Sequence, residues 1–156
     1  MTSLAGTPSA IADLKADALI LGLDRQGAVA AHPQVAPAIV DAIGSAAAAL
    51  DPSGKRGKVT VLPGTVVPAD ALGADAGYSR VVLVGLGDAT EGDLRYAAGA
   101  ASRSCGKHPA SVVVAIPAAT DREHAAIAEG AVLGAYSFTD YKKDAPDHED
   151  EGTSWL

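Results

Sequence analysis

Short runs of continuous apolar residues alternate along this chain with segments in which apolar residues recur at helical spacing. The apolar runs cover residues 16–23, 59–61, 80–86 and 111–116. Runs of this length, apolar at successive positions, are typical of strands buried on both faces. Val66 and Val67 can extend the sheet at an edge, although Pro68 limits that stretch, and residues 68–78 are expected to form a loop.

Three segments between these runs predict amphipathic helices. The first begins at Pro37 and ends before residues 51–54, with Ile39, Ile43, Ala46 and Leu50 on one stripe and Val40 and Ala47 beside it. The second is capped by Thr90, with Asp93 at the reciprocal position of a capping-box-like pair, and its apolar stripe is Leu94, Ala97, Ala98, Ala101 and Cys105. The third is capped by Thr120, runs to about residue 136, and shares one face among Ile127, Ala131, Gly134 and Phe138.

This alternation predicts a three-layer α/β domain with a largely parallel sheet and right-handed crossovers. Gly130 and Gly134, four residues apart on the last helix, leave a groove into which a strand or helix can approach closely. We expect residues 1–141 to form this domain and residues 142–156 to form an acidic linker. Five carboxylates lie there without an intervening cation, at Asp144, Asp147, Glu149, Asp150 and Glu151.

Composition narrows the function classes. The formal net charge is −7, and there is no basic stripe, so binding to nucleic acid or to an anionic membrane is not expected. A single cysteine excludes an intramolecular disulfide. The chain has no apolar run long enough to span a bilayer and no cationic, apolar N-terminal signal, so a cytoplasmic location is expected.

The turn Gly85-Leu86-Gly87-Asp88-Ala89-Thr90 is the strongest candidate for a ligand site, because it follows a strand and opens a helix, as phosphate-binding turns do. Thr90 replaces the third glycine of that motif. Carboxylates at Asp88, Glu91 and Asp93 crowd the helix N-terminus, where they satisfy the helix dipole and repel phosphate. A tight turn before a capped helix is therefore favoured over nucleotide binding.

No catalytic, cofactor-binding or metal-binding residue is assigned. The histidines, His32, His108, His124 and His148, include no pair at the spacing that puts two imidazoles on one helical turn. His148 and its acidic neighbours can collect a cation weakly, but a solvated linker is favoured. Cys105 has Ser102, Arg103, Ser104 and Lys107 nearby, yet its place on an apolar stripe predicts a buried thiol.

Aromatic and cationic residues gather after the last predicted helix, at Tyr136, Phe138, Tyr141, Lys142 and Lys143. In a chain with 4% aromatic residues, this concentration fits a docking surface or a hinge to another domain. A small satellite core that fixes the helix end fits it equally well.

Two segments resemble the N-terminal domain of the leucyl (cytosol) aminopeptidase family. One is Val81 to Gly87 (VVLVGLG) followed by the alanine-rich helix from Leu94. The other is residues 129–142 (EGAVLGAYSFTDYK), which is similar to the family stretch leading toward the catalytic domain. The resemblance covers most of residues 16–143 and implies a macro-domain-like fold. It also implies that the chain is the N-terminal part of a longer protein.

The resemblance further implies a parent enzyme that hydrolyses N-terminal residues from peptides with two divalent metals, zinc or manganese, and that assembles as a hexamer. None of the family's metal-binding motifs occurs in this chain, so the expected partner is its own catalytic C-terminal domain. The fragment itself is expected to be non-catalytic, with a role in assembly or substrate access. The alternative is a stand-alone macro-like module that binds ADP-ribose or a related nucleotide, which rests on fold analogy and on Gly85 and Gly87.

Overall fold

The computed structural model describes residues 3–105, 109 and 111–135. Its centre is a four-stranded sheet in the order β2-β3-β1-β4. The strands are β1 (Lys15–Leu23), β2 (Val59–Pro63), β3 (Gly77–Gly85) and β4 (Val112–Ala115). β1 pairs in parallel with β3 and with β4, and β2 runs antiparallel to β3 at one edge. The expectation of a mostly parallel sheet is therefore confirmed.

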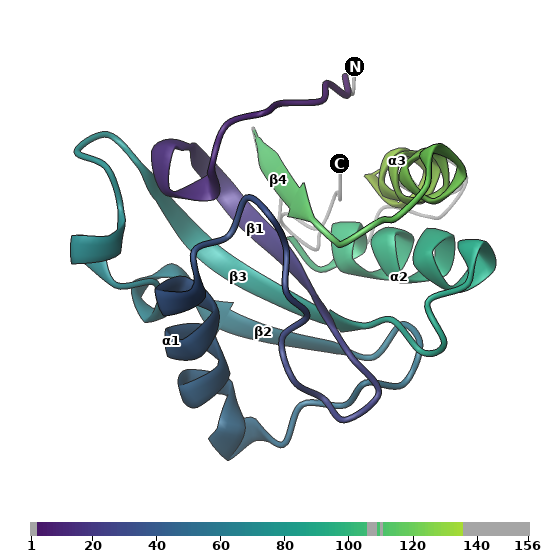
Figure 1. Ribbon diagram of the computed structural model, residues 1–156, viewed down its shortest axis with the longest axis horizontal. Coiled ribbons are helices and arrows are strands. Elements are labelled where there is room, and N and C mark those ends of the chain that lie inside the picture. Colours follow the sequence, from purple (N-terminus) through teal and green to yellow (C-terminus); the bar gives the residue numbers. More distant parts are fainter. Residues whose placement is uncertain (1–2, 106–108, 110, 136–156) are drawn as a thin grey trace, which may run out of the picture.

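Helices cover both faces of the sheet, which gives the three layers predicted for an α/β domain (Figure 1). α1 (Pro37–Ala47) lies on one face, and α2 (Glu91–Arg103) and α3 (Asp121–Ala135) lie together on the other. Successive residues of β1 divide between the two layers, because side chains alternate across a strand. Leu19, Leu21 and Leu23 pack on the α1 side, whereas Ala18 and Ile20 pack against α2 and α3.

The first helix is shorter than predicted, and its buried stripe differs. α1 ends at Ala47, a 3₁₀ turn covers Ala48–Leu50, and Asp51 follows with a left-handed φ of 48°. The buried positions are Ile39, Ile43 and Ala47, spaced four apart, while Ala46 is exposed and Leu50 is 54% exposed. The prediction that Ala46 and Leu50 face the core is wrong, because only the stripe formed by Ile39, Ile43 and Ala47 is buried.

The segment between β2 and β3 also differs from expectation. Gly64–Val66 forms a 3₁₀ turn and not an extension of the sheet, and a second turn covers Ala69–Ala71 within the expected loop. β3 then begins at Gly77, earlier than predicted. Another 3₁₀ turn, Ile11–Asp13, precedes β1 and contacts β3, because the hydroxyl of Tyr78 donates to the carbonyl of Ile11 at 2.7 Å.

The glycine groove on α3 is filled by α2, as its spacing predicted. A Cβ added at Gly130 would lie 2.0 Å from the carbonyl oxygen of Arg95, and one added at Gly134 would lie 2.4 Å from that of Gly99. The two helices therefore pack backbone to backbone. An ion pair between Arg95 and Glu129, at 3.1 Å, lies on the exposed side of the same contact.

Candidate functional site at the end of β3

The turn after β3 has the placement of a phosphate-binding turn but not its free donors. The amides of residues 85–89 all donate hydrogen bonds within the protein, over 2.9 to 3.1 Å. Their acceptors, in order, are the carbonyls of Lys58, Leu23 and Gly54, the carboxylate of Asp93 and the carbonyl of Leu86. A phosphate cradle requires backbone N–H groups that point at the ligand. None of these five amides is free to donate to a phosphate.

Gly85 in the turn, and Gly54 in the loop before β2, allow other backbone segments to approach closely. A Cβ added at Gly85 would lie 2.1 Å from the carbonyl oxygen of Lys55, and one added at Gly54 would lie 1.9 Å from that of Asp24. Gly87 has a left-handed φ of 59°, which costs a glycine little. The glycine pattern that suggested a nucleotide site is thus explained by packing of the loop before β2 over the end of β3.

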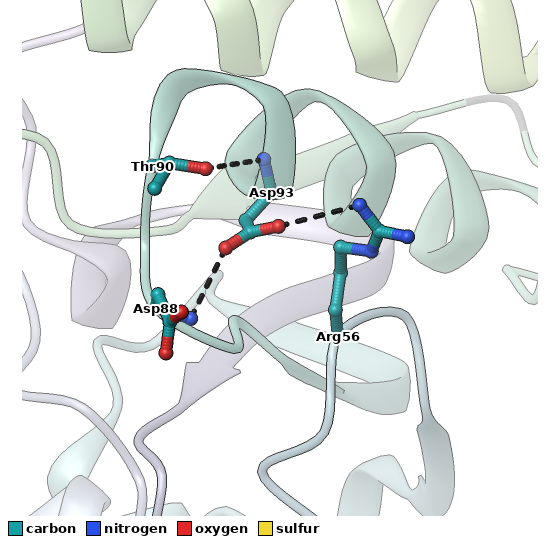
Figure 2. A network of polar contacts seen from close by, with 4 residues as sticks. All are labelled: Arg56, Asp88, Thr90 and Asp93. Carbon is teal, nitrogen blue, oxygen red and sulfur yellow. Dashed lines mark hydrogen bonds and ion pairs between the residues drawn. The ribbon is translucent and has the colours of Figure 1, made fainter.

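The half-buried carboxylate of Asp93 closes the turn (Figure 2). The side chain of Asp93, 16% exposed, accepts the amide of Asp88 at 3.1 Å and forms an ion pair with Arg56 at 3.4 Å. Thr90 caps α2, as predicted, by accepting the amide of Asp93 at 3.1 Å. The reciprocal contact differs from a capping box, since Asp93 reaches the amide of Asp88 and not that of the cap residue.

Two cations compensate the acidic turn from outside. Arg25, from the loop after β1, forms an exposed ion pair with Asp88. Arg56 also lies over the ring of Tyr96, 4.7 Å from its centroid. Gly57 makes room for that ring, because a Cβ there would lie 2.2 Å from it. The sequence pattern identified the carboxylates but not their partners. Arg56, for example, lies 37 positions away from Asp93 in the chain.

The geometry therefore favours the structural interpretation of the turn. The amides of residues 85–89 have acceptors within the protein, and Gly85 is contacted by backbone. The N-terminal end of α2 also carries its own negative charge on Glu91 and Asp93. The ADP-ribose alternative receives no support from this site.

Two of the four histidines are brought near each other from distant parts of the chain. His32, in the loop after β1, has its pKa lowered from the usual value by burial and then by the charge of His124 on α3. The Nδ1 of His32 accepts the amide of Gln34 at 3.1 Å, which requires an unprotonated nitrogen. His108 and His148 lie outside the described residues. Within the described part of the chain, no group of three or more potential metal ligands comes together.

Cys105 is buried, as its place on the apolar stripe predicted. It is 4% exposed, its thiol lies 3.3 Å from the carbonyl of Ala101, and burial raises its pKa to about 11 against a lowering contribution from Arg80. Ser102 is buried as well, and the hydroxyl of Ser104 donates to the carbonyl of Ala100 at 3.1 Å. A protonated thiol in an apolar site is a poor nucleophile. Lys107 lies outside the described residues.

An open hollow of about 450 Å³ lies at the opposite edge of the sheet, where β1 and β3 begin. Its polar lining is Lys15, Asp17, Tyr78, Ser79 and Ser111. Tyr78 already donates to Ile11, and burial raises its pKa to about 12. The amide of Ser111 donates to Asp17 at 3.3 Å. These contacts tie the starts of the strands together.

The aromatic and cationic cluster of residues 136–143 lies outside the described residues, as do the predicted domain boundary at 141 and the linker 142–156. No helix in the described part is both long and apolar enough to cross a membrane.

Fold and site together define a three-layer α/β domain whose glycine-rich turn is closed by its own side chains. Residues 20–145 match the model of the cytosol aminopeptidase family, N-terminal domain. The chain belongs to this family and corresponds to its N-terminal domain, in agreement with the resemblance seen in the sequence.

Curated relatives support the same assignment. A "Probable cytosol aminopeptidase" of Streptomyces griseus subsp. griseus is 38% identical over 154 residues, covering 91% of this chain and 28% of the relative. Proteins of the same name from Streptomyces coelicolor and Micrococcus luteus are each 38% identical, over 93% and 88% of this chain and 28% and 27% of the relative. The chain thus spans little more than a quarter of the length of these relatives.

Proposed function

We propose that this chain is the non-catalytic N-terminal domain of a metal-dependent cytosol aminopeptidase, which releases N-terminal amino acids from peptides. The observation that carries the proposal is the match of residues 20–145 to the N-terminal domain of the family, together with coverage of 28% of the relatives. In this view the reaction belongs to the remaining, C-terminal part of the parent protein.

The chemistry of the described residues supports this division of roles. Two divalent metals, zinc or manganese, would activate water and polarise the scissile carbonyl in the parent. The described residues do not fit such a centre, since they bring no three potential ligands together. The proposal therefore places both metals in the C-terminal domain and derives no step from this one.

The partners of the domain are proposed to be its own catalytic domain and further copies of the parent in a hexamer. A role in assembly or in access of substrate is compatible with the close packing of α2 on α3 and with the closed turn. The relatives carry the word cytosol in their names, and a net charge of −7 disfavours nucleic acid as a partner. We propose a cytoplasmic location on the same grounds.

The test is an activity comparison. The 156-residue chain, supplied with Mn²⁺ or Zn²⁺, is assayed with leucine p-nitroanilide beside the full-length Streptomyces coelicolor relative. The proposal expects turnover by the relative and none by this chain. Metal-dependent release of nitroaniline by this chain alone, abolished by a chelator, would overturn the non-catalytic role.

The contribution to assembly is tested separately in that relative. Deletion of the residues that align with this chain is expected to change the oligomeric state in sedimentation or the kcat/KM for a tripeptide. A deletion variant with the same oligomeric state and the same kcat/KM as the full-length relative would contradict the accessory role.

A further inference from the structure

Residues 3–9 lie along the outside of the domain, before the 3₁₀ turn Ile11–Asp13, and are exposed at every position (Figure 1). Among the described residues, the hydrogen bonds from this segment to other parts of the chain all involve one side chain. The side-chain nitrogen of Gln34 donates to the carbonyl of Thr7 at 2.7 Å and to that of Ser9 at 3.2 Å. Gln34 therefore holds the segment against the domain.

The chain that follows this segment is anchored by other contacts. Ile11 is buried, and its carbonyl accepts the hydroxyl of Tyr78. The carbonyl of Ala12 accepts the amide of Gly73 at 2.8 Å. Loss of the bonds from the Gln34 side chain would therefore free residues 3–9 and leave the chain from Ile11 onward in place.

The position of Gln34 depends on His32, two residues earlier in the same turn. The Nδ1 of His32 accepts the amide of Gln34 at 3.1 Å, and the carbonyl of His32 accepts the amide of Val35 at 3.1 Å. Val35 is buried, so the turn is anchored to the core. A protonated imidazole carries hydrogen on both ring nitrogens and accepts no hydrogen bond. Protonation of His32 would therefore break its bond to Gln34 and set one N–H against another.

The charged surroundings of His32 are simple. Its pKa is lowered from the usual value by burial and then by the charge of His124, on α3. Residues 28–35 of its own loop contain no other ionisable side chain, and residues 3–9 contain none. Protonation of His32 is thus opposed by His124, and the segment held by Gln34 has no titration of its own.

We propose that the turn His32–Val35 is a pH-sensitive latch, which holds residues 3–9 through Gln34 while His32 is neutral and releases them when His32 is protonated. The latched state disfavours the imidazolium, so the released state binds the proton more tightly. Acid therefore favours release. The transition lies below the usual pKa of 6.5, because burial and His124 both lower the pKa of His32.

The test is ¹⁵N NMR of the 156-residue chain between pH 7.5 and pH 5. The heteronuclear NOE of residues 3–9 measures their order on the ps–ns timescale, and the ring protons of His32 are recorded in the same samples. We expect the NOE to fall to the level of a free chain end, with the same midpoint as the titration of His32. The amide of Leu86, which donates to the carbonyl of Leu23 at 3.1 Å, should stay protected from exchange because the domain remains folded.

Three variants separate the parts of the latch. His32→Asn offers a side-chain oxygen in place of Nδ1 and does not titrate, so residues 3–9 should stay ordered at both pH values. Gln34→Glu replaces the donor nitrogen by an acceptor, so the segment should be released at both. His124→Gln removes a like charge and should move the midpoint of release to higher pH.

Four results would overturn the proposal. Residues 3–9 of the unsubstituted chain could stay ordered at pH 5, His32→Asn could lose order at the same pH as the unsubstituted chain, or Gln34→Glu could keep the segment ordered. The fourth is loss of protection at Leu86 together with the loss of order, which would mean that acid unfolds the domain. None of these measurements involves peptidase activity, so the inference can fail while the proposed function stands.

Discussion

The turn after β3 and the contact between α2 and α3 both bring two backbone segments close together, but different interactions surround them. At both places glycines let two backbones approach, with Gly85 of the turn against the loop before β2, and Gly130 and Gly134 between the helices. The turn adds a carboxylate, a cap and two cations. The helix contact has only an exposed ion pair beside it. Glycine thus marks close packing in this domain at both sites.

This difference predicts how much stability is lost when each region is substituted. In the helix contact the neighbouring atoms are backbone carbonyls within regular helices, which cannot move aside without shifting a whole element. In the turn, polar side chains hold loops together, and losing one contact leaves the others in place. Substitutions in the helix contact should therefore cost more than those in the turn.

The largest effect is expected from Gly130→Ala, whose Cβ would lie 2.0 Å from the carbonyl oxygen of Arg95. We expect a loss of about 1–3 kcal/mol in the free energy of unfolding, because overpacking forces the helices apart. Chemical denaturation followed by circular dichroism measures it. The matched control is Gly44→Ala on α1, where nothing lies within 4 Å of the added Cβ. It should stabilise by roughly 0.5–1 kcal/mol through helix propensity. Equal effects at both positions would contradict the close packing.

Next in size is Asp93→Ala, which removes the acceptor for the amide of Asp88 and the partner of Arg56. We expect a loss of about 1–2 kcal/mol, since the turn loses a hydrogen bond to a charged acceptor together with the ion pair to Arg56. Asp88→Asn is the control, because it removes only the exposed ion pair with Arg25 and should cost about 0–1 kcal/mol. If Asp88→Asn costs as much as Asp93→Ala in the same denaturation assay, Asp93 does not close the turn.

Thr90→Ala should cost about 1 kcal/mol through loss of the helix cap. The same change at Thr120, which accepts the amide of Glu123 at 3.1 Å, should cost a similar amount. Unfolding midpoints in urea give both values. A cap that contributes at only one of the two helices would show that the turn network, and not capping, dominates at α2.

The reactivity of Cys105 reports whether its thiol is buried beneath α2, as the structure shows. Burial raises its pKa to about 11 from 9.0, so the folded state holds the proton more tightly than the unfolded state does. This preference stabilises the fold fully below about pH 9 and is lost as the pH rises toward about 11. We expect slow labelling by a thiol reagent at pH 8 in the native chain and rapid labelling in urea. Fast native labelling would show that the thiol is accessible.

The smallest expected effect concerns the pair His32 and His124, which lies outside both regions. Because burial and His124 lower the pKa of His32, stability from its neutral form is present above the usual pKa of 6.5 and declines as the pH falls below that value. NMR titration of the ring protons should give His32 a pKa below 6.5. In His124→Gln the pKa of His32 should rise, since a like charge is removed. An unchanged titration would mean that burial alone sets it.

Much of the fold could be predicted from the pattern of apolar residues. The four strands, the three helices, the caps at Thr90 and Thr120 and the buried Cys105 are all confirmed. The end of the first helix was not predicted correctly, because α1 and its buried stripe end at Ala47. The prediction that Val66 and Val67 extend the sheet at an edge is wrong, because Val66 ends the 3₁₀ turn Gly64–Val66 and Val67 follows it as the cap residue. Strand propensity alone does not separate the two settings.

The sequence by itself determined the α/β class, the order of the elements and membership of the family, because hydrophobic periodicity and motif residues are local properties. Only the tertiary structure decided what the glycines and charges do. Whether a turn is open to phosphate depends on where its amides find acceptors, and here the acceptors include Leu23, Gly54 and Lys58 from other parts of the chain. Contacts of that kind are set by packing between distant segments, which no local pattern records.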